Sequence, residues 1–336
     1  MKSLTLPRAL TALAASALLL AGCTGTPATT QTAGAGATGD GAASSYTIGV
    51  AQYVTHSSLD AAVTGFKEAI ADAGLTVTYN DQNQNADPGT GTAIANTFRD
   101  DADIDLVLAV ATPTAQAIAQ VLTDRPVLFT AVTDPVAARL VDSLEAPGGN
   151  VTGTTDMNPV ADQIALVKQI KPDAASIGII YSSGEVNSEV QVEAARPAAE
   201  AEGLTVQEVT VTNTAEVEQA VNSLNVDAIY VPTDNNVVSG LGSVIRYAEA
   251  QQIPVIAGEG DSVANGAVIT YGLDYTELGR QVGEMAVAIL TEGADPATMP
   301  VETQREPKLY VNEAAAARMG VTIPAELLTG AELVGS

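Results

Sequence analysis

Short β-branched runs alternate with helical patterns along most of this chain. The first run covers 46–52 (YTIGVAQ), and from Leu59 to Ala73 apolar residues recur at the i, i+3 and i+4 spacing of one helix face. Further strands are predicted at 75–79, 105–111 and 126–132, with helices between them. This βαβ rhythm is typical of a parallel sheet that is covered by helices on both faces.

The same rhythm restarts after a Gly-rich segment at 148–153 (GGNVTG). The strands predicted beyond it are 176–181, 204–211, 226–231, 253–257 and 267–271. The predicted helices are 160–170, 186–202, 214–224, 236–251 and 275–291. Two successive βαβ arrays in a body too long for one ordinary domain predict two α/β lobes that face each other across a cleft.

The start of the chain has the pattern of a targeting segment. Lys2 and Arg8 are positive, and the apolar run at 9–22 is shorter than the roughly 18–20 residues that span a bilayer. This run ends in Leu20-Ala21-Gly22-Cys23, which resembles the lipobox of bacterial lipoproteins. We expect a lipoprotein signal peptide at 1–22 and acylation, of the palmitate kind, at Cys23; the alternative is an ordinary signal peptide.

Composition and charge indicate how the folded part of the chain is attached to the membrane. Residues 23–45 after this segment are almost wholly Gly, Ala, Ser, Thr and Pro, and such a stretch is typical of a flexible tether. The formal net charge is −26, which repels nucleic acid and anionic lipid headgroups. We therefore exclude nucleic-acid binding and expect membrane attachment through the lipid anchor alone.

Hydroxyl groups and predicted helix starts follow the strands of the first array. Thr112-Pro113 and Thr133-Asp134-Pro135 each place a Thr where a helix cap is expected, and Ser57-Ser58-Leu59-Asp60 has the pattern of a capping box. Free N–H groups at helix starts hold anions. We expect a ligand carboxylate to bind to Thr112, to the N–H of Ala131 and to Thr133.

Carboxylates and amides follow the strands of the second array instead. They occur at 182–187 (SSGEVN), 233–236 (TDNN) and 259–262 (EGDS). Charged acceptors of this kind suit an ammonium group. We expect the amine of a zwitterionic ligand to bind among Glu185, Asn187, Asp234 and Asp261; the alternative for each residue is that it only caps a helix.

Enzyme classes are poorly supported by the residues present. His56 is the only histidine, Cys23 is the only cysteine, and no P-loop lysine motif occurs. A single histidine also gives no metal cluster of the usual spacing. We expect no catalysis, no metal and no cofactor.

Several strings resemble the tryptophan/tyrosine-type ABC transporter substrate-binding proteins, a branch of the type I periplasmic-binding fold. The matching stretches are 56–66 (HSSLDAAVTGF), 105–117 (DLVLAVATPTAQA), 126–136 (PVLFTAVTDPV), 150–156 (NVTGTTD), 185–188 (EVNS), 230–236 (YVPTDNN), 261–263 (DSV) and 274–279 (DYTELG). One departure is Ser57, where the family often has Pro.

The resemblance implies a fold, partners and a location. The implied fold is α/β, with two doubly wound parallel-sheet lobes joined by a three-stranded hinge, and with crossings near 152–156, 272–275 and 298–304. Lobe 1 is expected at 46–154 plus 275–300, and lobe 2 at 155–274 plus 301–336. A monomer that is lipid-anchored on the extracellular or periplasmic side of the cell membrane would deliver its ligand to ABC permease and ATPase subunits.

The resemblance also implies a hydrophobic or aromatic amino acid as the ligand, captured by hinge closure. Tyr53 is a candidate for stacking on its ring, whereas Phe129 is expected in the core. The predicted ligand-binding residues are Tyr53, His56, Thr112, Ala131, Thr133, Asp134, Glu185, Asn187, Asp234, Asn235 and Asp261. A sensory binding module of the same fold, or another small solute such as a sugar, is the alternative.

Overall fold

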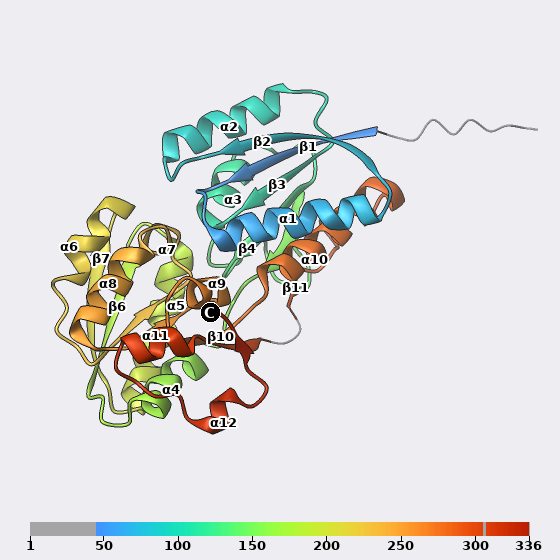
Figure 1. Ribbon diagram of the computed structural model, residues 1–336. Coiled ribbons are helices and arrows are strands. Elements are labelled where there is room, and N and C mark those ends of the chain that lie inside the picture. Colours follow the sequence, from blue (N-terminus) through green and yellow to red (C-terminus); the bar gives the residue numbers. More distant parts are fainter. Residues whose placement is uncertain (1–44, 305–306, 336) are drawn as a thin grey trace, which may run out of the picture. The chain divides into compact units, whose positions relative to one another are not determined.

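The computed structural model describes residues 45–304 and 307–335, which fold into two β-sheets flanked by helices (Figure 1). These residues lie within one unit, Ala43–Ser336. The predicted signal peptide at 1–22, the lipidation site Cys23 and nearly all of the tether at 23–45 lie outside the described residues. None of the described helices is long and apolar enough to cross a membrane.

The first sheet has the strand order β11-β5-β4-β3-β1-β2, and its described pairs are all parallel. Its strands are β1 (Ser45–Gln52), β2 (Thr76–Asn83), β3 (Leu106–Val110), β4 (Val127–Val132), β5 (Val151–Thr155) and β11 (Glu302–Thr303). Its helices are α1 (Ser57–Asp72), α2 (Pro88–Asp100), α3 (Thr112–Ala119) and α10 (Tyr275–Val287), which continues as a π-helical turn over Ala288–Glu292. One core packs under α1 and α10 and a second under α2 and α3, so both faces of this sheet are covered.

Helices α1 and α10 lie side by side in Figure 1, although about two hundred residues separate them in the chain. Glycines allow this approach. A Cβ atom at Gly65 would lie 1.9 Å from the carbonyl oxygen of Thr276, and one at Gly279 would lie 2.0 Å from that of Ala62. The contact fixes α10, and therefore Tyr275 at its start, against the first sheet.

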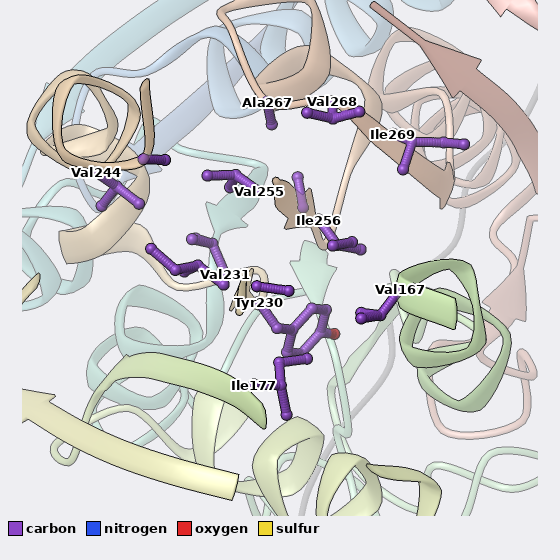
Figure 2. Packing of buried hydrophobic residues seen from close by; sticks show 14 of the residues in the cluster. Val167, Ile177, Tyr230, Val231, Val244, Val255, Ile256, Ala267, Val268 and Ile269 are labelled. Carbon is purple, nitrogen blue, oxygen red and sulfur yellow. The ribbon is translucent and has the colours of Figure 1, made fainter. Parts of the chain in front are cut away.

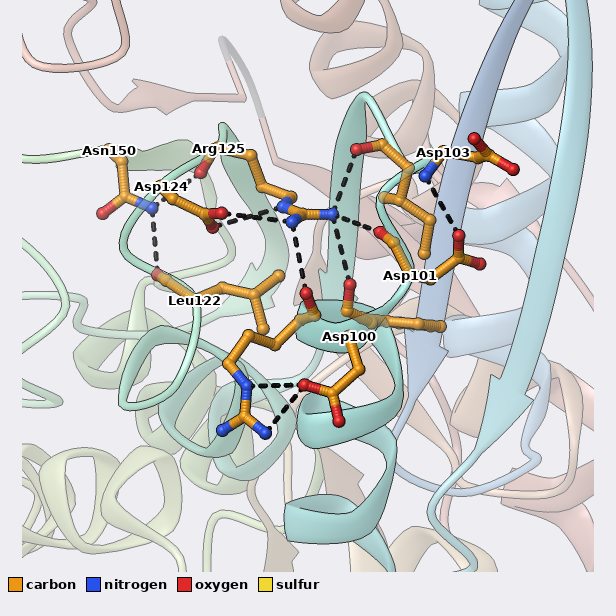
Figure 3. A network of polar contacts seen from close by, with 10 residues as sticks. Asp100, Asp101, Asp103, Leu122, Asp124, Arg125 and Asn150 are labelled. Atoms are coloured by element: carbon orange, nitrogen blue, oxygen red, sulfur yellow. Dashed lines mark hydrogen bonds and ion pairs between the residues drawn. The ribbon is translucent and has the colours of Figure 1, made fainter.

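The side chain of Arg125 caps the C-terminal end of α2 (Figure 3). Its guanidinium group donates to the carbonyl oxygens of Phe98, Arg99, Asp101 and Ile104 at 2.7–3.3 Å. The last carbonyl groups of a helix have no partner within the helix, so a cation placed there satisfies them and complements the helix dipole.

The second sheet has the order β13-β12-β10-β9-β8-β6-β7, with β12 antiparallel to β10 and the other described pairs parallel. Its strands are β6 (Ser176–Ser182), β7 (Thr205–Val211), β8 (Ala228–Val231), β9 (Val255–Ala257), β10 (Ile269–Gly272), β12 (Lys308–Val311) and β13 (Glu332–Leu333). Its helices are α4 (Val160–Ile170), α5 (Val186–Ala201), the 3-10 turn η1 (Thr214–Glu216), α6 (Val217–Val221), α7 (Asn235–Ser239), α8 (Leu241–Gln251), α9 (Gly260–Ala264), α11 (Glu313–Arg318) and α12 (Ala325–Leu328).

The core of the second sheet consists mainly of Val and Ile side chains from neighbouring strands, as Figure 2 shows. Tyr230 at its centre is fully buried, and its hydroxyl donates to Oε1 of Gln163 at 2.8 Å. Gln163 in turn donates to the carbonyl oxygens of Gly258 and Tyr271. Because each polar group in this core has a partner, α4 is held in one position against the ends of β9 and β10.

The chain passes between the two sheets three times. The first passage lies between β5 and α4, and the second lies between β10 and α10. The third follows β11, which still pairs with β5 in the first sheet, so the first sheet extends a few residues beyond the predicted boundary at 300. The predicted fold class, with two parallel-sheet lobes and three connecting segments, is confirmed; the lobe boundaries stay a prediction.

Local details correct several element predictions. The expected capping box is wrong, because α1 begins at Ser57 and its N-cap is His56, which makes no side-chain cap bond. Thr112 is likewise the first residue of α3 and not its cap. No helix follows Thr133-Asp134-Pro135; the carboxylate of Asp134 caps a turn instead, accepting from the N–H groups of Val136 and Ala137. The helix predicted at 236–251 is divided at Gly240.

Candidate functional site

A small cavity, here the central cavity, is lined by residues of both sheets and of the segments that join them. Its volume of about 20 Å³ is far below the roughly 300–1,000 Å³ range of small-molecule sites. The first-sheet side contributes His56, Ser58, Leu59 and Ala131. The connecting segments contribute Asp156 and Tyr275. The second-sheet side contributes Asn187, Thr233, Asp234, Asn235, Val238 and Glu259.

The start of α1 presents unpartnered polar groups to the cavity. Nε2 of His56 lies 3.3 Å from Oδ1 of Asn235, which can only accept, so this ring nitrogen carries the proton and Nδ1 is left as an acceptor. Burial lowers the pKa of His56, which favours this neutral form. Nδ1 of His56 and the hydroxyl of Ser58 are buried without a hydrogen-bond partner. Buried polar groups normally have partners, so these two are suited to a ligand.

Ala131, at the end of β4, has a left-handed backbone conformation with φ of 56°. The register between β4 and β5 shifts between Phe129 and Val132, so a bulge interrupts the ladder beside the cavity. Bulges and positive φ values of this kind occur next to binding sites, where they redirect the backbone.

Asp156 and Tyr275 line the cavity where the segment after β5 meets the start of α10. The hydroxyl of Tyr275 donates to Oδ2 of Asp156 at 2.6 Å, and the hydroxyl of Thr133 donates to Oδ1 at 2.9 Å. Asp156 is only 2 % exposed, and burial raises the pKa of its carboxyl group. Burial, followed by the nearby Asp156 carboxylate, also raises the pKa of Tyr275, so its phenol keeps the proton that it donates.

Glu185 and Asp234 are two further buried carboxylates on the second-sheet side, and of these Asp234 lines the cavity. Glu185 accepts hydrogen bonds from the side-chain amides of Asn187, Asn235 and Asn236. Asp234 accepts from the backbone N–H groups of Ser182 and Val237 and from the hydroxyl of Ser188. Burial and the neighbouring Asp234 raise the pKa of Glu185 to about 8, and burial raises that of Asp234 as well.

Glu259 completes the acidic lining. Its carboxylate accepts from the backbone N–H and the hydroxyl of Ser262, and so caps α9. Burial and the adjacent Asp261 raise the pKa of Glu259 to about 7. No Lys or Arg is among the described residues that line the cavity. The lining is therefore rich in acceptors, which suits a ligand that carries several N–H or O–H donors and a positive charge.

Direct contacts hold the two sides of the cavity together. Besides the His56–Asn235 contact, Nδ2 of Asn265 donates to the hydroxyl of Ser57 at 3.0 Å. The hydroxyls of Thr133 and Thr233 lie 3.4 Å apart. The described residues contain no group of three or more His, Cys, Asp or Glu side chains placed to hold a metal ion.

Residues 47–334 match the model of the family described as ABC transporter substrate binding protein. The chain belongs to this family. Membership confirms the predicted resemblance and places this substrate-binding protein among solute binders and not among enzymes.

Named relatives are similar over most of their length. A "Tyrosine-binding protein" from Clostridioides difficile (strain R20291) is 40% identical over 272 residues, which cover 79% of this chain and 78% of the relative. The crystal structure of the ABC domain in complex with L-Trp from Streptococcus pneumonia is 36% identical, with a TM-score of 0.83 over 87% of this chain and 100% of that one. The ligand-free, open structure of a substrate binding protein with adhesive properties from Clostridium difficile is 40% identical, with a TM-score of 0.66 over 87% of this chain and 99% of that one.

Five of the eleven predicted ligand-binding residues line the central cavity of this substrate-binding protein. They are His56, Ala131, Asn187, Asp234 and Asn235. The amide oxygen of Asn187 is buried without a partner, like Nδ1 of His56, whereas the carboxylate of Asp234 is surrounded by donors from the protein.

The other six predicted residues lie around the cavity without lining it. Tyr53 is buried in the core under α1, and burial together with Glu185 raises its pKa to about 12. The hydroxyl of Thr112 is buried without a partner, and that of Thr133 supports Asp156. Asp134 caps its own turn.

Of the remaining two, Glu185 orders the asparagines of the second-sheet wall. Asp261 lines a neighbouring hollow of about 170 Å³ together with Tyr275. Phe129 is fully buried in the core of the first sheet, as predicted.

Seven lining residues were missed by the sequence analysis: Ser58, Leu59, Asp156, Thr233, Val238, Glu259 and Tyr275. Six of them lie in stretches that the sequence singles out. Ser58 and Leu59 lie in 56–66, Thr233 in 230–236 and Glu259 in 259–262, while Asp156 and Tyr275 lie in 150–156 and 274–279. Sequence pattern alone does not show which side chain of such a stretch faces the cavity.

Proposed function

We propose that this chain is the solute-binding lipoprotein of an ABC importer and captures a hydrophobic or aromatic amino acid, such as tryptophan, tyrosine or phenylalanine, by closure of its two lobes. The observation that carries this proposal is the acceptor-rich central cavity, which suits an ammonium group, in a chain whose relatives include a tyrosine-binding protein and a structure in complex with L-Trp.

The start of α1 supports a place for the ligand carboxylate. The helix has sixteen residues, its N-cap side chain makes no cap bond, and the buried hydroxyl of Ser58 beside it has no partner. Uncapped N–H groups and the positive end of the helix dipole favour a carboxylate there. Ala131 lines the same side of the cavity and stays in the proposal, whereas Thr112 and Thr133 lie outside the lining.

Closure is supported by the similarity to the two solved structures. The TM-score is higher against the complex with L-Trp, at 0.83, than against the ligand-free, open relative, at 0.66, although sequence identity to the open relative is greater. Contacts across the cavity, such as that of His56 with Asn235, are of the kind that a ligand would stabilise.

Calorimetry of the full chain with the common amino acids tests the ligand. We expect one or more aromatic amino acids to bind at micromolar concentration or tighter and simple sugars not to bind. The absence of binding by every amino acid in the panel would contradict the proposal.

We also propose attachment to the extracytoplasmic face of the cell membrane through a lipid on Cys23, with delivery to permease and ATPase subunits by a monomer. A single acyl chain binds membranes only reversibly, so stable anchoring needs more than one. Cys23→Ser is expected to release the protein from the membrane fraction and to remove the lipid mass from its N-terminal peptide. Unchanged fractionation would contradict the anchor and leave the ligand proposal intact.

A further inference from the structure

The four buried carboxylates of the site differ in the donors that the protein supplies to them. Glu185, Asp234 and Glu259 each receive at least one N–H group, and Asp234 and Glu259 cap helices. From other residues, the Asp156 carboxylate receives only two donors, the hydroxyls of Thr133 and Tyr275. Among the four, it is the carboxylate to which no other described residue supplies an N–H group or a cation.

A buried carboxylate in this situation is costly to ionise. Desolvation disfavours the charged form, and two neutral hydroxyls compensate for it only in part. Each carboxylate oxygen of Asp156 accepts one hydrogen bond and retains capacity for another. Asp156 is 2 % exposed and lines the central cavity, so a group within the cavity can supply the N–H donors and the positive charge that the protein does not.

We propose that the carboxylate of Asp156 forms an ion pair with the ammonium group of the ligand. The pair would lie where the segment after β5 meets the start of α10. This inference rests on the proposed amino-acid ligand and names the residue that selects it. The unpartnered acceptors Nδ1 of His56 and Oδ1 of Asn187 lie on the same lining and complete a set that an ammonium group, with its three N–H donors, can use.

The position of Asp156 links recognition to closure. Asp156 follows β5 at the first passage between the sheets, and Tyr275 begins α10 just after the second. An ammonium group that pairs with Asp156 stabilises the arrangement in which these two segments are hydrogen bonded. Only such a differential interaction lets a ligand shift an equilibrium between open and closed forms.

The experiment compares Asp156→Asn with the wild-type chain and uses two probes, tryptophan and indole-3-propionate, which lacks only the amino group. We expect the substitution to weaken tryptophan binding about ten- to a hundredfold, since charge-assisted hydrogen bonds have that strength. Affinity for indole-3-propionate should change by less than about twofold. Glu259→Gln is the matched comparison, because it neutralises the other cavity carboxylate that has few donors.

The outcomes separate the possibilities. If Asp156→Asn weakens the binding of both probes equally, the inference is wrong. It is also wrong if only Glu259→Gln weakens tryptophan binding without affecting indole-3-propionate. In either case, tryptophan binding by the wild type would still support the proposed function. No binding of any aromatic amino acid by the wild type would overturn both. If Asp156→Asn does not fold, the carbon chemical shift of the Asp156 carboxyl group is measured in the wild type by NMR. Tryptophan should change this chemical shift, and indole-3-propionate should not. Equal changes with both probes would overturn the inference.

Discussion

The hydroxyl of Tyr275 donates to Oδ2 of Asp156 over 2.6 Å, and this single bond joins two of the three segments that connect the sheets. Both side chains are at most 3 % exposed and both line the central cavity. The bond therefore belongs both to the connection between the sheets and to the lining of the central cavity.

Tyr275→Phe removes this donor and keeps the ring. We expect tryptophan affinity to fall by about tenfold, because hydrogen bonds to charged groups contribute about 1.5–3 kcal/mol and the Asp156 carboxylate becomes harder to ionise. Calorimetry measures the change. Tyr181→Phe is the control, since it also removes a phenol–carboxylate bond, to Glu208, outside the cavity lining. Equal effects of the two substitutions would contradict a role for Tyr275 in the site.

The stability of the ligand-free protein should fall as pH rises from about 6 to about 9. The folded-state pKa of Glu185 is raised to about 8 and that of Glu259 to about 7, whereas in the unfolded chain both are near 4.5. The folded state therefore binds more protons than the unfolded state across this range, and the slope of unfolding free energy against pH is negative.

Thermal unfolding in a series of buffers measures this dependence. Glu185→Gln should flatten it, since the variant has no proton to lose at that position. A melting temperature that stays constant or rises between pH 6 and pH 9 would show that these carboxyl groups are ionised in the folded protein.

Gly279→Ala is expected to destabilise the protein by about 2 kcal/mol or more. The added Cβ would lie 2.0 Å from the carbonyl oxygen of Ala62, so α1 and α10 must separate. Gly184→Ala is the matched control, because a Cβ there has no atom within 4 Å. Urea unfolding gives both values, and similar midpoints for the two variants would count against the close helix contact.

Arg125→Ala should cost about 1–3 kcal/mol of unfolding free energy, because the carbonyl groups at the end of α2 lose their donor. Arg99→Ala nearby is the comparison. Arg99 pairs with Asp100 at the exposed surface, where ion pairs contribute about 0–1 kcal/mol. An equally small effect at Arg125 would mean that water satisfies these carbonyl groups in its absence.

The sequence by itself determined the succession of strands and helices and the fold class, because hydrophobic periodicity is a local property of the chain. The helix predicted at 160–170 coincides with α4, and the strand predicted at 204–211 begins one residue before β7. It also identified the loops at the strand ends, since the carboxyl ends of parallel strands lie on one edge of a sheet. Asn187, which lines the central cavity, lies in one of these loops.

Only the tertiary structure decided which side chains of those loops line the central cavity. Glu185 and Asp234 look like ammonium ligands in sequence, but their oxygens are surrounded by donors from loops far away in the chain. Asp156 and Tyr275 are separated by more than a hundred residues, and no periodicity predicts that they meet. Three-dimensional packing determines which donors each buried carboxylate receives, and Asp156 receives only hydroxyl groups from other described residues.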